Sequence, residues 1–552
     1  MPPRPFPMKN WIASFFRIVR DDKGQTQGYP IPWDPARPSL YSVLQPYAEA
    51  AEGLPAGGLE LPDEDAGDGD GLSWAPGALD GVLGHHAAGD DLQAAQAIHD
   101  LLLATLDDPT PNLPRLYQQV ADGSVLAFID PLIERLLARP GLPRARLHAL
   151  ALWLARSSPD RGAVKFALAL LGALDSGSQR ALFLTFGLHE EFTLYAAVAL
   201  GCSLAPPERE RAWWSLARKV HGWGRIHLVE RLAVTPSPEV QDWLLREGYR
   251  NAVMVEYLAY PCAVGGNLLA ALSGQDVDDG LLDAANELVG ALLAGGPARD
   301  IHDYADGAEV VLLLLDHLAR RPPRALAHLI VAAQVADFIE SPHTDWDALH
   351  EHGWSEALRE EILRRARELC QPERWEALVN QGLDAADDVR FHEAAQAAGL
   401  LGIDCWERWL ARQREGRSSA WYHLMQSDDP ARIAQVLDLA RERLDLAAIA
   451  SGPGTALGLG LAYQAHGDLD FIIQRLGAFP GQGWDLLDTA LASPVVRNRN
   501  MALNALEAWS REDWPAEAVQ RLRRAHDLEP VEDLKRRLGE LLQPQLVERP
   551  AP

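Results

Sequence analysis

The sequence predicts an all-α fold, an array of stacked antiparallel helix pairs with an extended N-terminal arm. From about residue 73, apolar residues recur at i, i+3, i+4 and i+7, which is typical of helices that bury one face. Proline or glycine interrupts this pattern at helix-sized intervals, and alternating apolar segments between hairpin turns are missing. These observations favour many short helices over a sheet. One such apolar stripe comprises Leu147, Leu150, Ala151 and Leu154.

The composition narrows the classes of function. The chain has 552 residues, with 51 Lys and Arg against 78 Asp and Glu, and a net charge of −27. This acidic balance argues against a general nucleic-acid binder, whose contact surface is basic. A hydrophobic content of 47% excludes wholesale disorder. No apolar run reaches the roughly 18–20 residues that a membrane span needs, so the sequence also argues against a membrane protein.

The cysteines and the N-terminus favour a cytoplasmic location. Cys202, Cys262, Cys370 and Cys405 form no CxxC pair, which excludes the common cysteine-rich zinc sites and a thioredoxin-like motif. We expect four buried free thiols in a reducing compartment. The first residues also lack the apolar core and cleavage site of a secretory signal.

The first 72 residues are expected to form an arm. Residues 1–20 are predicted to hold an amphipathic helix that folds back over the protein, with docking to a membrane surface or a partner as the alternative. Residues 21–72 combine a proline-rich strap carrying aromatic anchors with an acidic linker. The linker does not fit a calcium loop, because Ala66 and Gly77 would occupy the first and last ligand positions. The array follows over residues 73–545, and residues 546–552 form a tail.

The C-terminal part shows a repeat most clearly. Pro494 and Pro530 each precede an apolar helix, and helices are predicted over residues 495–509 and 516–528. The segment from Ser493 to Leu506, with its proline, early arginine and small-Ala-Leu stripe, resembles a HEAT repeat. That resemblance implies a solenoid of stacked helix pairs with a concave binding surface. The apolar runs at 310–315 and 329–331 are expected to be buried helices rather than strands.

Four segments are similar to a bacterial family whose members often carry the name limonene hydroxylase. The segments are Trp74–His86, Gly222–Arg231, Trp243–Asn251 and Ser493–Met501. The resemblance covers the chain beyond about residue 73, and the name implies a monooxygenase.

The residues do not contain the cofactor motifs that a monooxygenase would use. Neither Cys202 nor Cys405 lies in the glycine-rich loop, with a Phe-x-x-Gly lead-in, that would present a haem ligand. Gly452, Gly454 and Gly458 depart from the dinucleotide fingerprint, because a proline occupies the tight turn and the third glycine comes one place late. We expect a turn between helices there, and no cofactor is predicted.

Asp80, His85 and His86 are the first candidate site. An aspartate with a histidine can act as an acid–base pair or bind a metal. Adjacent histidines point to different faces of a helix, so we expect at most one of them to share a site with Asp80. The alternative is structural: Asp80 caps a helix and the histidines pack beside Trp74.

A second candidate is the dense polar run within residues 222–231. It could bind a carboxylate or phosphate group of a partner through its arginines, or form ion pairs inside the fold. Arg497 and Arg499 allow the same two interpretations. Trp74 and Trp223 could supply interface anchors or line a groove. The polar run contains Trp223, Arg225, His227, Glu230 and Arg231.

A third candidate is a metal site. His343, Asp347 and His350 lie within one short segment, and Asp347 and His350 are three residues apart, so they could share a helix face. The alternative is a polar loop in which residues from Thr344 to Asp347 cap a helix.

Together these features favour a cytosolic scaffold that binds a protein or peptide partner on the concave surface of the solenoid. The negative charge favours a basic partner, and a binding role is favoured over an enzyme. The first alternative is an enzyme or a small-molecule or metal-binding protein, as the monooxygenase name implies. The second is a helical-repeat DNA-binding protein, which would need short arginine clusters such as 135–146 and 521–524 to converge in space.

Overall fold

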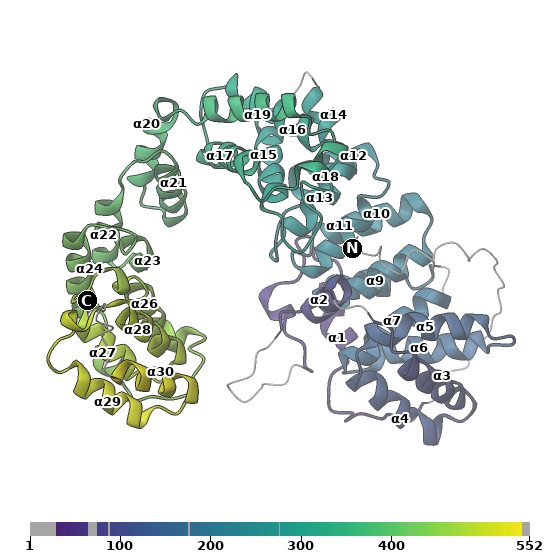
Figure 1. Ribbon diagram of the computed structural model, residues 1–552. Coiled ribbons are helices and arrows are strands. Elements are labelled where there is room, and N and C mark those ends of the chain that lie inside the picture. Colours follow the sequence, from purple (N-terminus) through teal and green to yellow (C-terminus); the bar gives the residue numbers. More distant parts are fainter. Residues whose placement is uncertain are drawn as a thin grey trace. The chain divides into compact units, whose positions relative to one another are not determined.

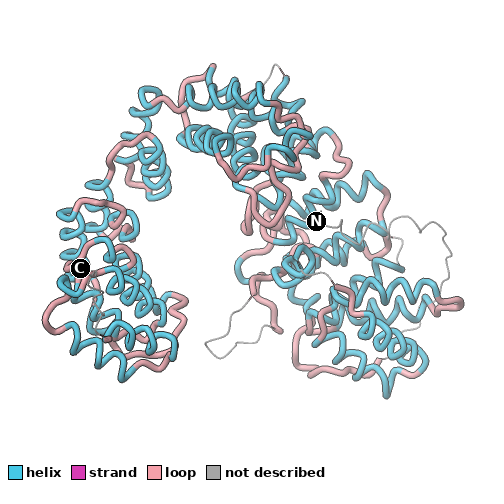
Figure 2. The backbone as a smooth tube through the Cα atoms, viewed as in Figure 1, coloured by secondary structure: helices cyan, strands magenta, loops and turns pink. Residues whose placement is uncertain are grey.

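The computed structural model describes residues 29–63, 74–86, 89–174, 177–274, 277–417 and 419–543. Within these ranges the chain forms helices joined by turns and contains no strand (Figure 2). The β pairing in the described ranges amounts to one isolated parallel bridge between Ala456 and Val495. The prediction of an all-α fold is therefore confirmed. The helix expected within residues 1–20, most of the acidic linker and the tail at 546–552 lie outside the described residues.

The chain divides into two compact units, which we describe separately (Figure 1). Unit 1 comprises residues 1–322 and 331–369, and unit 2 comprises residues 323–330 and 370–552. The division falls within α17 (Leu326–Glu340).

Unit 1 consists of short helices in close succession. Beside the larger part of α17, its elements are α1 (Leu40–Leu44), η2 (Gln45–Tyr47), η3 (Ala56–Gly58), α2 (Ala78–His86), α3 (Leu92–Asp107), α4 (Pro109–Asp122), α5 (Val125–Ala138), α6 (Arg144–Ser157), α7 (Arg161–Leu174), α8 (Arg180–Phe186), α9 (Glu190–Ser203), α10 (Pro206–Ala217), α11 (Trp223–Leu232), α12 (Pro238–Trp243), η4 (Leu244–Gly248), α13 (Glu256–Gly265), α14 (Leu268–Ser273), α15 (Asp279–Ala294), α16 (Gly307–Ala319), α18 (Trp346–Glu351) and α19 (Glu356–Leu369).

Helices close in sequence pack against each other in unit 1. α6 packs on α7, α7 on α9, and α9 on α11. The apolar stripe predicted for α6 is buried throughout. Gly172 of α7 lies so close to α9 that a Cβ atom there would be 2.7 Å from the Cα of Ala199. Glycine therefore allows these two helix backbones to approach each other.

The strap folds onto the helices of unit 1. The rings of Tyr29 and Trp33 each lie 5.0 Å from the ring of Trp153, which matches the aromatic anchors expected in this segment. Residues 40–47 are helical, however, and this corrects the expectation of a wholly extended strap. The reason is local, since the hydroxyl of Ser39 accepts a hydrogen bond at the start of α1 and caps that helix.

Unit 2 contains the remaining elements. They are α20 (Pro372–Leu383), α21 (Asp388–Leu400), α22 (Trp406–Glu415), α23 (Trp421–Leu424), α24 (Pro430–Arg443), α25 (Leu446–Ile449), η5 (Leu461–Tyr463), α26 (Gln464–Ile473), η6 (Leu476–Ala478), α27 (Trp484–Leu491), α28 (Val496–Ala508), η7 (Arg511–Asp513), α29 (Ala518–Leu528) and α30 (Glu532–Leu542).

The helices of unit 2 also pack in sequential pairs. α20 packs on α21, α27 on α28, and α29 on α30. The helices predicted over 495–509 and 516–528 correspond to α28 and α29. Inside this packing, the indole N–H of Trp509 donates a hydrogen bond of 2.7 Å to the carbonyl oxygen of Leu476.

Two further expectations can be compared with the structure. The apolar runs at 310–315 and 329–331 lie in α16 and α17, so the prediction of helices is confirmed. The expectation of four buried thiols is wrong, because Cys262 is buried whereas Cys202 is exposed in the last turn of α9. Among the described residues, no helix combines the length and the apolar character needed to cross a membrane.

Candidate functional site

Two segments singled out in the sequence pack directly against each other as α2 and α11. Gly81 of α2 lies under the indole of Trp223 on α11, and a Cβ atom at Gly81 would be 2.2 Å from that ring. A larger residue would push the two helices apart. Gly81 therefore permits the close contact of α2 with α11 (Figure 1).

Two neighbouring carboxylates at the start of α9 hold both helices. Glu190 accepts three hydrogen bonds of 2.6–2.7 Å from backbone N–H groups within residues 221–224, at the N-terminus of α11. Glu191 accepts one of 2.7 Å from the N–H of Gly77, just before α2. Helix N-termini carry unpaired N–H groups and a partial positive charge, which carboxylates stabilise. α2 and α11 thus share one anchor and keep a fixed relative position.

This packing brings His85 of α2 next to His227 and Glu230 of α11, and we name these three residues the histidine cluster. One imidazole nitrogen from each histidine and one carboxylate oxygen all lie within 4.8 Å of one another. Nε2 of His85 is 3.8 Å from Oε1 of Glu230, and the two imidazole rings stack with centroids 5.9 Å apart. His227 and Glu230 are three residues apart and therefore share a helix face. Within the described ranges, this is the group of three metal-ligating side chains with such geometry.

The surroundings of the histidine cluster disfavour charge on all three side chains. Burial lowers the pKa of His85 to about 4, with smaller contributions from His86 and Arg231. Burial also lowers the pKa of His227 well below its usual value. It raises the pKa of Glu230 to about 7, although the Arg231 charge acts in the opposite direction. The two histidines are therefore neutral at physiological pH, which is the form that binds metals.

Aromatic side chains border the cluster. The ring of Tyr257 on α13 lies 5.4 Å from that of His85 and 5.0 Å from that of Trp223. Nε2 of His86 is 2.9 Å from the hydroxyl of Tyr257, so His86 is turned to this tyrosine instead of to the cluster. The side chain of Glu230 keeps 31% of its surface exposed, which leaves the cluster accessible to solvent.

Asp80 belongs to a different group, which we name the ion-pair cluster. Its carboxylate lies 2.7 Å from the ammonium of Lys165 on α7, and Lys165 also pairs with Glu191. All three side chains are buried. The opposite charges compensate one another in place of water. The sequence suggested that one of the two histidines could share a site with Asp80. Asp80 instead pairs with Lys165. His85 lies beside His227 and Glu230, and His86 contacts Tyr257.

The arginines of the 222–231 run form hydrogen bonds inside the fold. The guanidinium of Arg225 donates hydrogen bonds of 3.0 and 2.6 Å to two backbone carbonyl groups, and it lies over the ring of Trp243. Arg231 donates one of 2.6 Å to the carbonyl oxygen of His227. These contacts favour the structural interpretation of both arginines over contact with a partner.

Arg497 and Arg499 in unit 2 also form internal ion pairs. Arg499 lies 2.8 Å from Glu529, and both side chains are 1% exposed. Arg497 pairs with Asp470 and is half exposed. All of Arg499 is thus inside the fold, where it contacts Glu529 and the loop at Gly454, whereas part of Arg497 remains on the surface.

The third predicted site is not assembled as a metal-ligating group. His343 lies in the loop before α18, and Asp347 and His350 lie on α18. In the described part of the chain these side chains do not bring three ligand atoms within 4.8 Å. The helix is capped by Asp345, whose carboxylate accepts a hydrogen bond from the N–H of Ala348.

The two tryptophans considered as anchors differ in burial. Trp74 is 63% exposed, whereas Trp223 is 5% exposed and packs on Gly81. His85 packs beside Trp223 and His86 contacts Tyr257, in place of the packing beside Trp74 that was expected for both.

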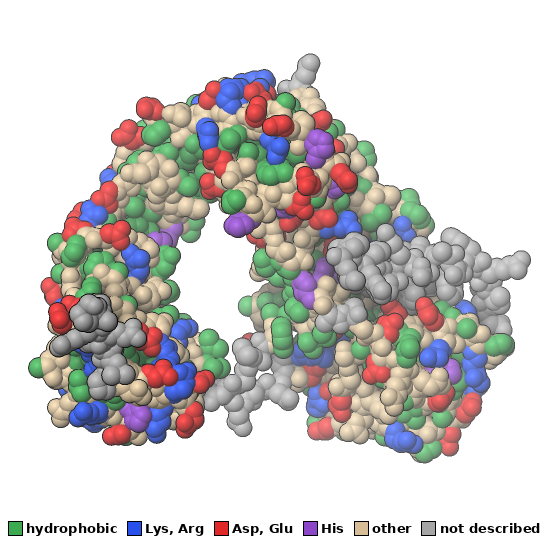
Figure 3. Space-filling view, in the orientation of Figure 1, with side chains coloured by type: hydrophobic (Ala, Val, Ile, Leu, Met, Phe, Trp, Pro, Cys, Tyr) green, Lys and Arg blue, Asp and Glu red, His purple; other side chains and the backbone are tan. Residues whose placement is uncertain are grey.

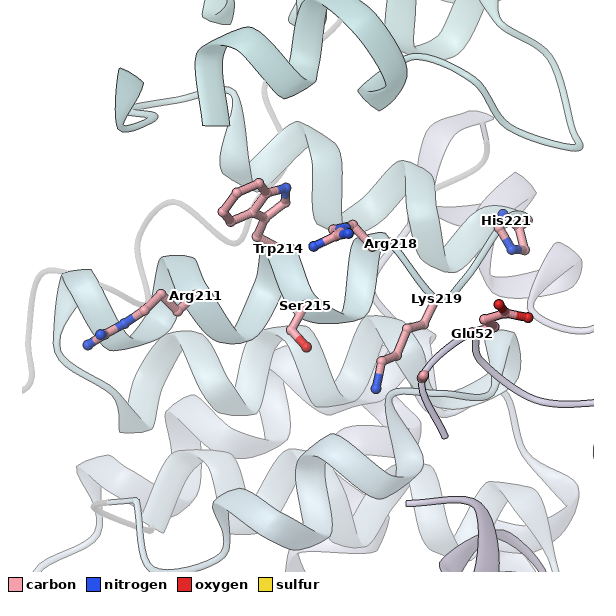
Figure 4. Close-up of a pocket in the computed structure, with 8 residues that line it drawn as sticks. Glu52, Arg211, Trp214, Ser215, Arg218, Lys219 and His221 are labelled. Atoms are coloured by element: carbon pink, nitrogen blue, oxygen red, sulfur yellow. The ribbon is translucent and has the colours of Figure 1, made fainter. Parts of the chain in front are cut away.

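A surface pocket of about 580 Å³ lies beside α10 (Figure 4). Three cationic side chains, one histidine and one carboxylate surround it, a combination that suits an anionic group. The pocket shares no residue with the histidine cluster. It is lined by Ala51, Glu52, Arg211, Trp214, Ser215, Arg218, Lys219 and His221.

Sequence reasoning missed several residues of these clusters. Lys165 could have been predicted, because a lysine within an apolar helix needs a buried acidic partner. Glu190 and Glu191 are the first two residues of a helix, and acids at this position predict a favourable interaction with the helix N-terminus. The sequence does not show that they also bind the starts of two other helices. Nothing local links Tyr257 to His85, since their contact depends on the packing of helices far apart in the chain.

Comparisons with known proteins do not place the chain in a family. No family model matches it, and neither does any curated protein. The resemblance to the proteins named limonene hydroxylase therefore has no support from them. Among solved structures, an engineered protein from the Northeast Structural Genomics Consortium aligns with 15% identity over 81% of this chain and 98% of its own. Its TM-score of 0.21 supports no conclusion on fold or function.

Proposed function

We propose that this protein is a cytosolic helical-repeat scaffold, a HEAT-like array, that binds a protein partner. The observation that carries the proposal is a row of exposed leucines in unit 2. Leu457, Leu459 and Leu461 are 74%, 59% and 92% exposed. Burying one leucine side chain contributes roughly 1.5–3 kcal/mol, and clustered exposed apolar residues mark interaction sites.

The loop that carries Leu457 and Leu459, and that leads into η5 at Leu461, is held by hydrogen bonds and close packing. The N–H of Ala456 donates a hydrogen bond of 3.2 Å to the carbonyl oxygen of Pro494, and Arg499 donates one of 2.7 Å to that of Gly454. Gly458 has a φ of 74°, and a Cβ atom there would lie 2.6 Å from a neighbouring valine. A loop already fixed in one conformation loses little entropy when it binds.

The charges of the molecule suggest the kind of partner. The net charge of −27 favours a basic protein through electrostatic complementarity. On the face shown in Figure 3, Lys and Arg side chains are interspersed with Asp and Glu, which suits a protein surface better than a nucleic-acid backbone. An apolar segment with basic flanks would match both the leucine row and the charge. We propose that the leucine row forms one end of the contact, and that the concave surface expected of a HEAT-like array forms the rest.

The test compares captured proteins from cells that express the full-length wild type or the triple variant Leu457→Ser, Leu459→Ser and Leu461→Ser. The matched control is Val389→Ser, which removes a single residue that is 77% exposed in the same unit. We expect one stoichiometric partner that binds the wild type and Val389→Ser and is lost from the triple variant. That partner should also dissociate as salt is raised. Retention of the same partner by the triple variant would overturn the proposal.

A further inference from the structure

We propose that His85, His227 and Glu230 form a binding site for one divalent transition-metal ion of the class that imidazole nitrogens bind, such as Zn²⁺. This inference concerns unit 1 and is independent of the leucine row in unit 2. Three observations carry it: the distances between the ligand atoms, the unpaired imidazole of His227, and the way the two helices are held.

The distances fit an ion that draws the ligands together slightly. Zn–N and Zn–O bonds of about 2.1 Å place two ligands of a tetrahedral ion about 3.4 Å apart. Nε2 of His85 and Oε1 of Glu230 are 3.8 Å apart, and all three ligand atoms lie within 4.8 Å. Side-chain rotations that move each ligand atom by about an ångström or less would complete the three bonds to the ion. Two imidazoles with one carboxylate leave the fourth position to water, as at zinc sites that keep an open position.

His227 supplies the second observation. It is 2% exposed, and neither of its ring nitrogens has a hydrogen-bond partner. A neutral imidazole has one N–H donor and one acceptor nitrogen, and buried groups of this kind are ordinarily paired. A metal ion would use the acceptor nitrogen, which nothing else in the described surroundings uses.

The anchors of the two helices supply the third observation. Glu190 fixes the N-terminus of α11 and Glu191 the start of α2 through backbone hydrogen bonds. The ligands are thus presented by helices whose relative position is set before any ion binds, which lowers the cost of assembling a site. Metal ions can enter from the side on which Glu230 is exposed.

The charges of the site predict its selectivity. Glu230 is the single acidic ligand, and the positive charge of Arg231 follows it directly on α11. Hard cations such as Mg²⁺ and Ca²⁺ prefer several oxygen ligands, and one carboxylate beside an arginine offers them little. Neutral imidazole nitrogens favour Zn²⁺, Co²⁺ and related ions.

The experiment uses untagged full-length protein stripped with a chelator. Zn²⁺ binding is measured by calorimetry and Co²⁺ binding by the visible d–d spectrum at neutral pH, with Mg²⁺ as a competitor. The variants are His85→Gln, His227→Leu and Glu230→Gln, and circular dichroism checks that each is folded. The matched controls are His86→Gln, adjacent in sequence but turned to Tyr257, and His350→Gln on α18.

We expect the wild type to bind one ion with nitrogen ligands to Co²⁺, unaffected by Mg²⁺. Each cluster variant should bind about 100-fold more weakly or worse, and the controls should match the wild type. No stoichiometric binding by the wild type would overturn the proposal. So would cluster variants that bind as the wild type does, or controls that lose the ion. If His227→Leu does not fold, the more conservative His85→Gln and Glu230→Gln decide the outcome.

Discussion

Two polar clusters lie beside α2 in unit 1, and they differ in how their buried atoms are paired. In the ion-pair cluster, Lys165 lies between two carboxylates and is 2.7 Å from Asp80. In the histidine cluster, neither ring nitrogen of the buried His227 has a hydrogen-bond partner among the described residues. Both clusters are positioned by the start of α9. Asp80 in the first cluster has a buried cation as its partner, whereas the imidazole of His227 in the second has no hydrogen-bond partner in the part of the chain that the structure describes.

The difference between the two clusters shows how a buried polar group can be interpreted. A buried group that is paired inside the protein is explained by the fold, because it compensates the loss of water. A buried group that remains unpaired needs another explanation, and a ligand is one of them. Asp80 is a group of the first kind. His227, whose ring nitrogens have no hydrogen-bond partner within the described ranges, is a group of the second kind.

The largest effect is expected from Lys165→Met, which leaves Asp80 buried without its cation and Glu191 with Arg161, 3.7 Å away, as its remaining cation. Breaking a buried ion pair from one side destabilises by about 3–5 kcal/mol. Hydrogen exchange of peptides from α2, α7 and α9 should show faster exchange throughout this region. As a control, Arg364→Met breaks exposed pairs with Glu361 and Glu368 and should have no measurable effect. Unchanged exchange in Lys165→Met would mean that the ion-pair cluster does not stabilise the packing.

The second-largest loss of stability is expected from Gly81→Ala, which brings a methyl group to 2.2 Å from the ring of Trp223. Overpacking of this kind costs about 1–3 kcal/mol, and it should also move His85 away from α11. We expect a lower thermal midpoint and loss of metal binding. Gly467→Ala is the control, since this helical glycine has open space around it and alanine is the better helix former. Normal metal binding by Gly81→Ala would show that the contact of α2 with α11 does not assemble the cluster.

The sequence predicted the helices more completely than the site, for physical reasons. Helices depend on local periodicity and capping, so α6, α28 and α29 could be located within a few residues. The polar run of α11 was also visible, because His227 and Glu230 lie at helical spacing. What local patterns do not contain is the pairing of His85 with that run, which depends on Gly81 packing under Trp223 and on Glu190 and Glu191 holding two helices at once.

An acid that is partly buried near like charges is a third kind of polar group, and its effect on stability should depend on pH. Asp130 on α5 is partly buried. Its burial, followed by the charges of Asp90 and Glu134, raises its pKa to about 6. Because its pKa is higher in the folded than in the unfolded state, the acid form favours folding at low pH, and this contribution is lost as pH rises through about 6. Asp130→Asn should therefore be about 1–2 kcal/mol more stable than the wild type at pH 8, after discounting for partial exposure.

The measurement for Asp130→Asn is unfolding at a series of pH values from 4 to 8. The gain over the wild type should shrink as pH falls from about 6 to about 4, because in this range the folded wild type holds the proton and the unfolded state does not, until the unfolded state also begins to take it up near pH 4. A gain of equal size at pH 4 and pH 8 would contradict the titration of Asp130 as its cause, and would indicate a packing effect of the amide instead.

The smallest effect in the metal-free protein, and the most discriminating, is expected from His227→Leu. Leucine is close to imidazole in volume and has no polar atoms, so removing an unpaired buried group should leave stability unchanged or raise it by up to about 1 kcal/mol. This is the opposite of Lys165→Met, although both residues are polar and buried. In excess Zn²⁺ the order should reverse, because an ion at 100 times its Kd stabilises the wild type by about 2.7 kcal/mol and leaves the variant unaffected. Thermal unfolding with chelator and with Zn²⁺ measures both. A large loss of stability in chelator would show that His227 is already paired within the fold, and the two clusters would then be alike.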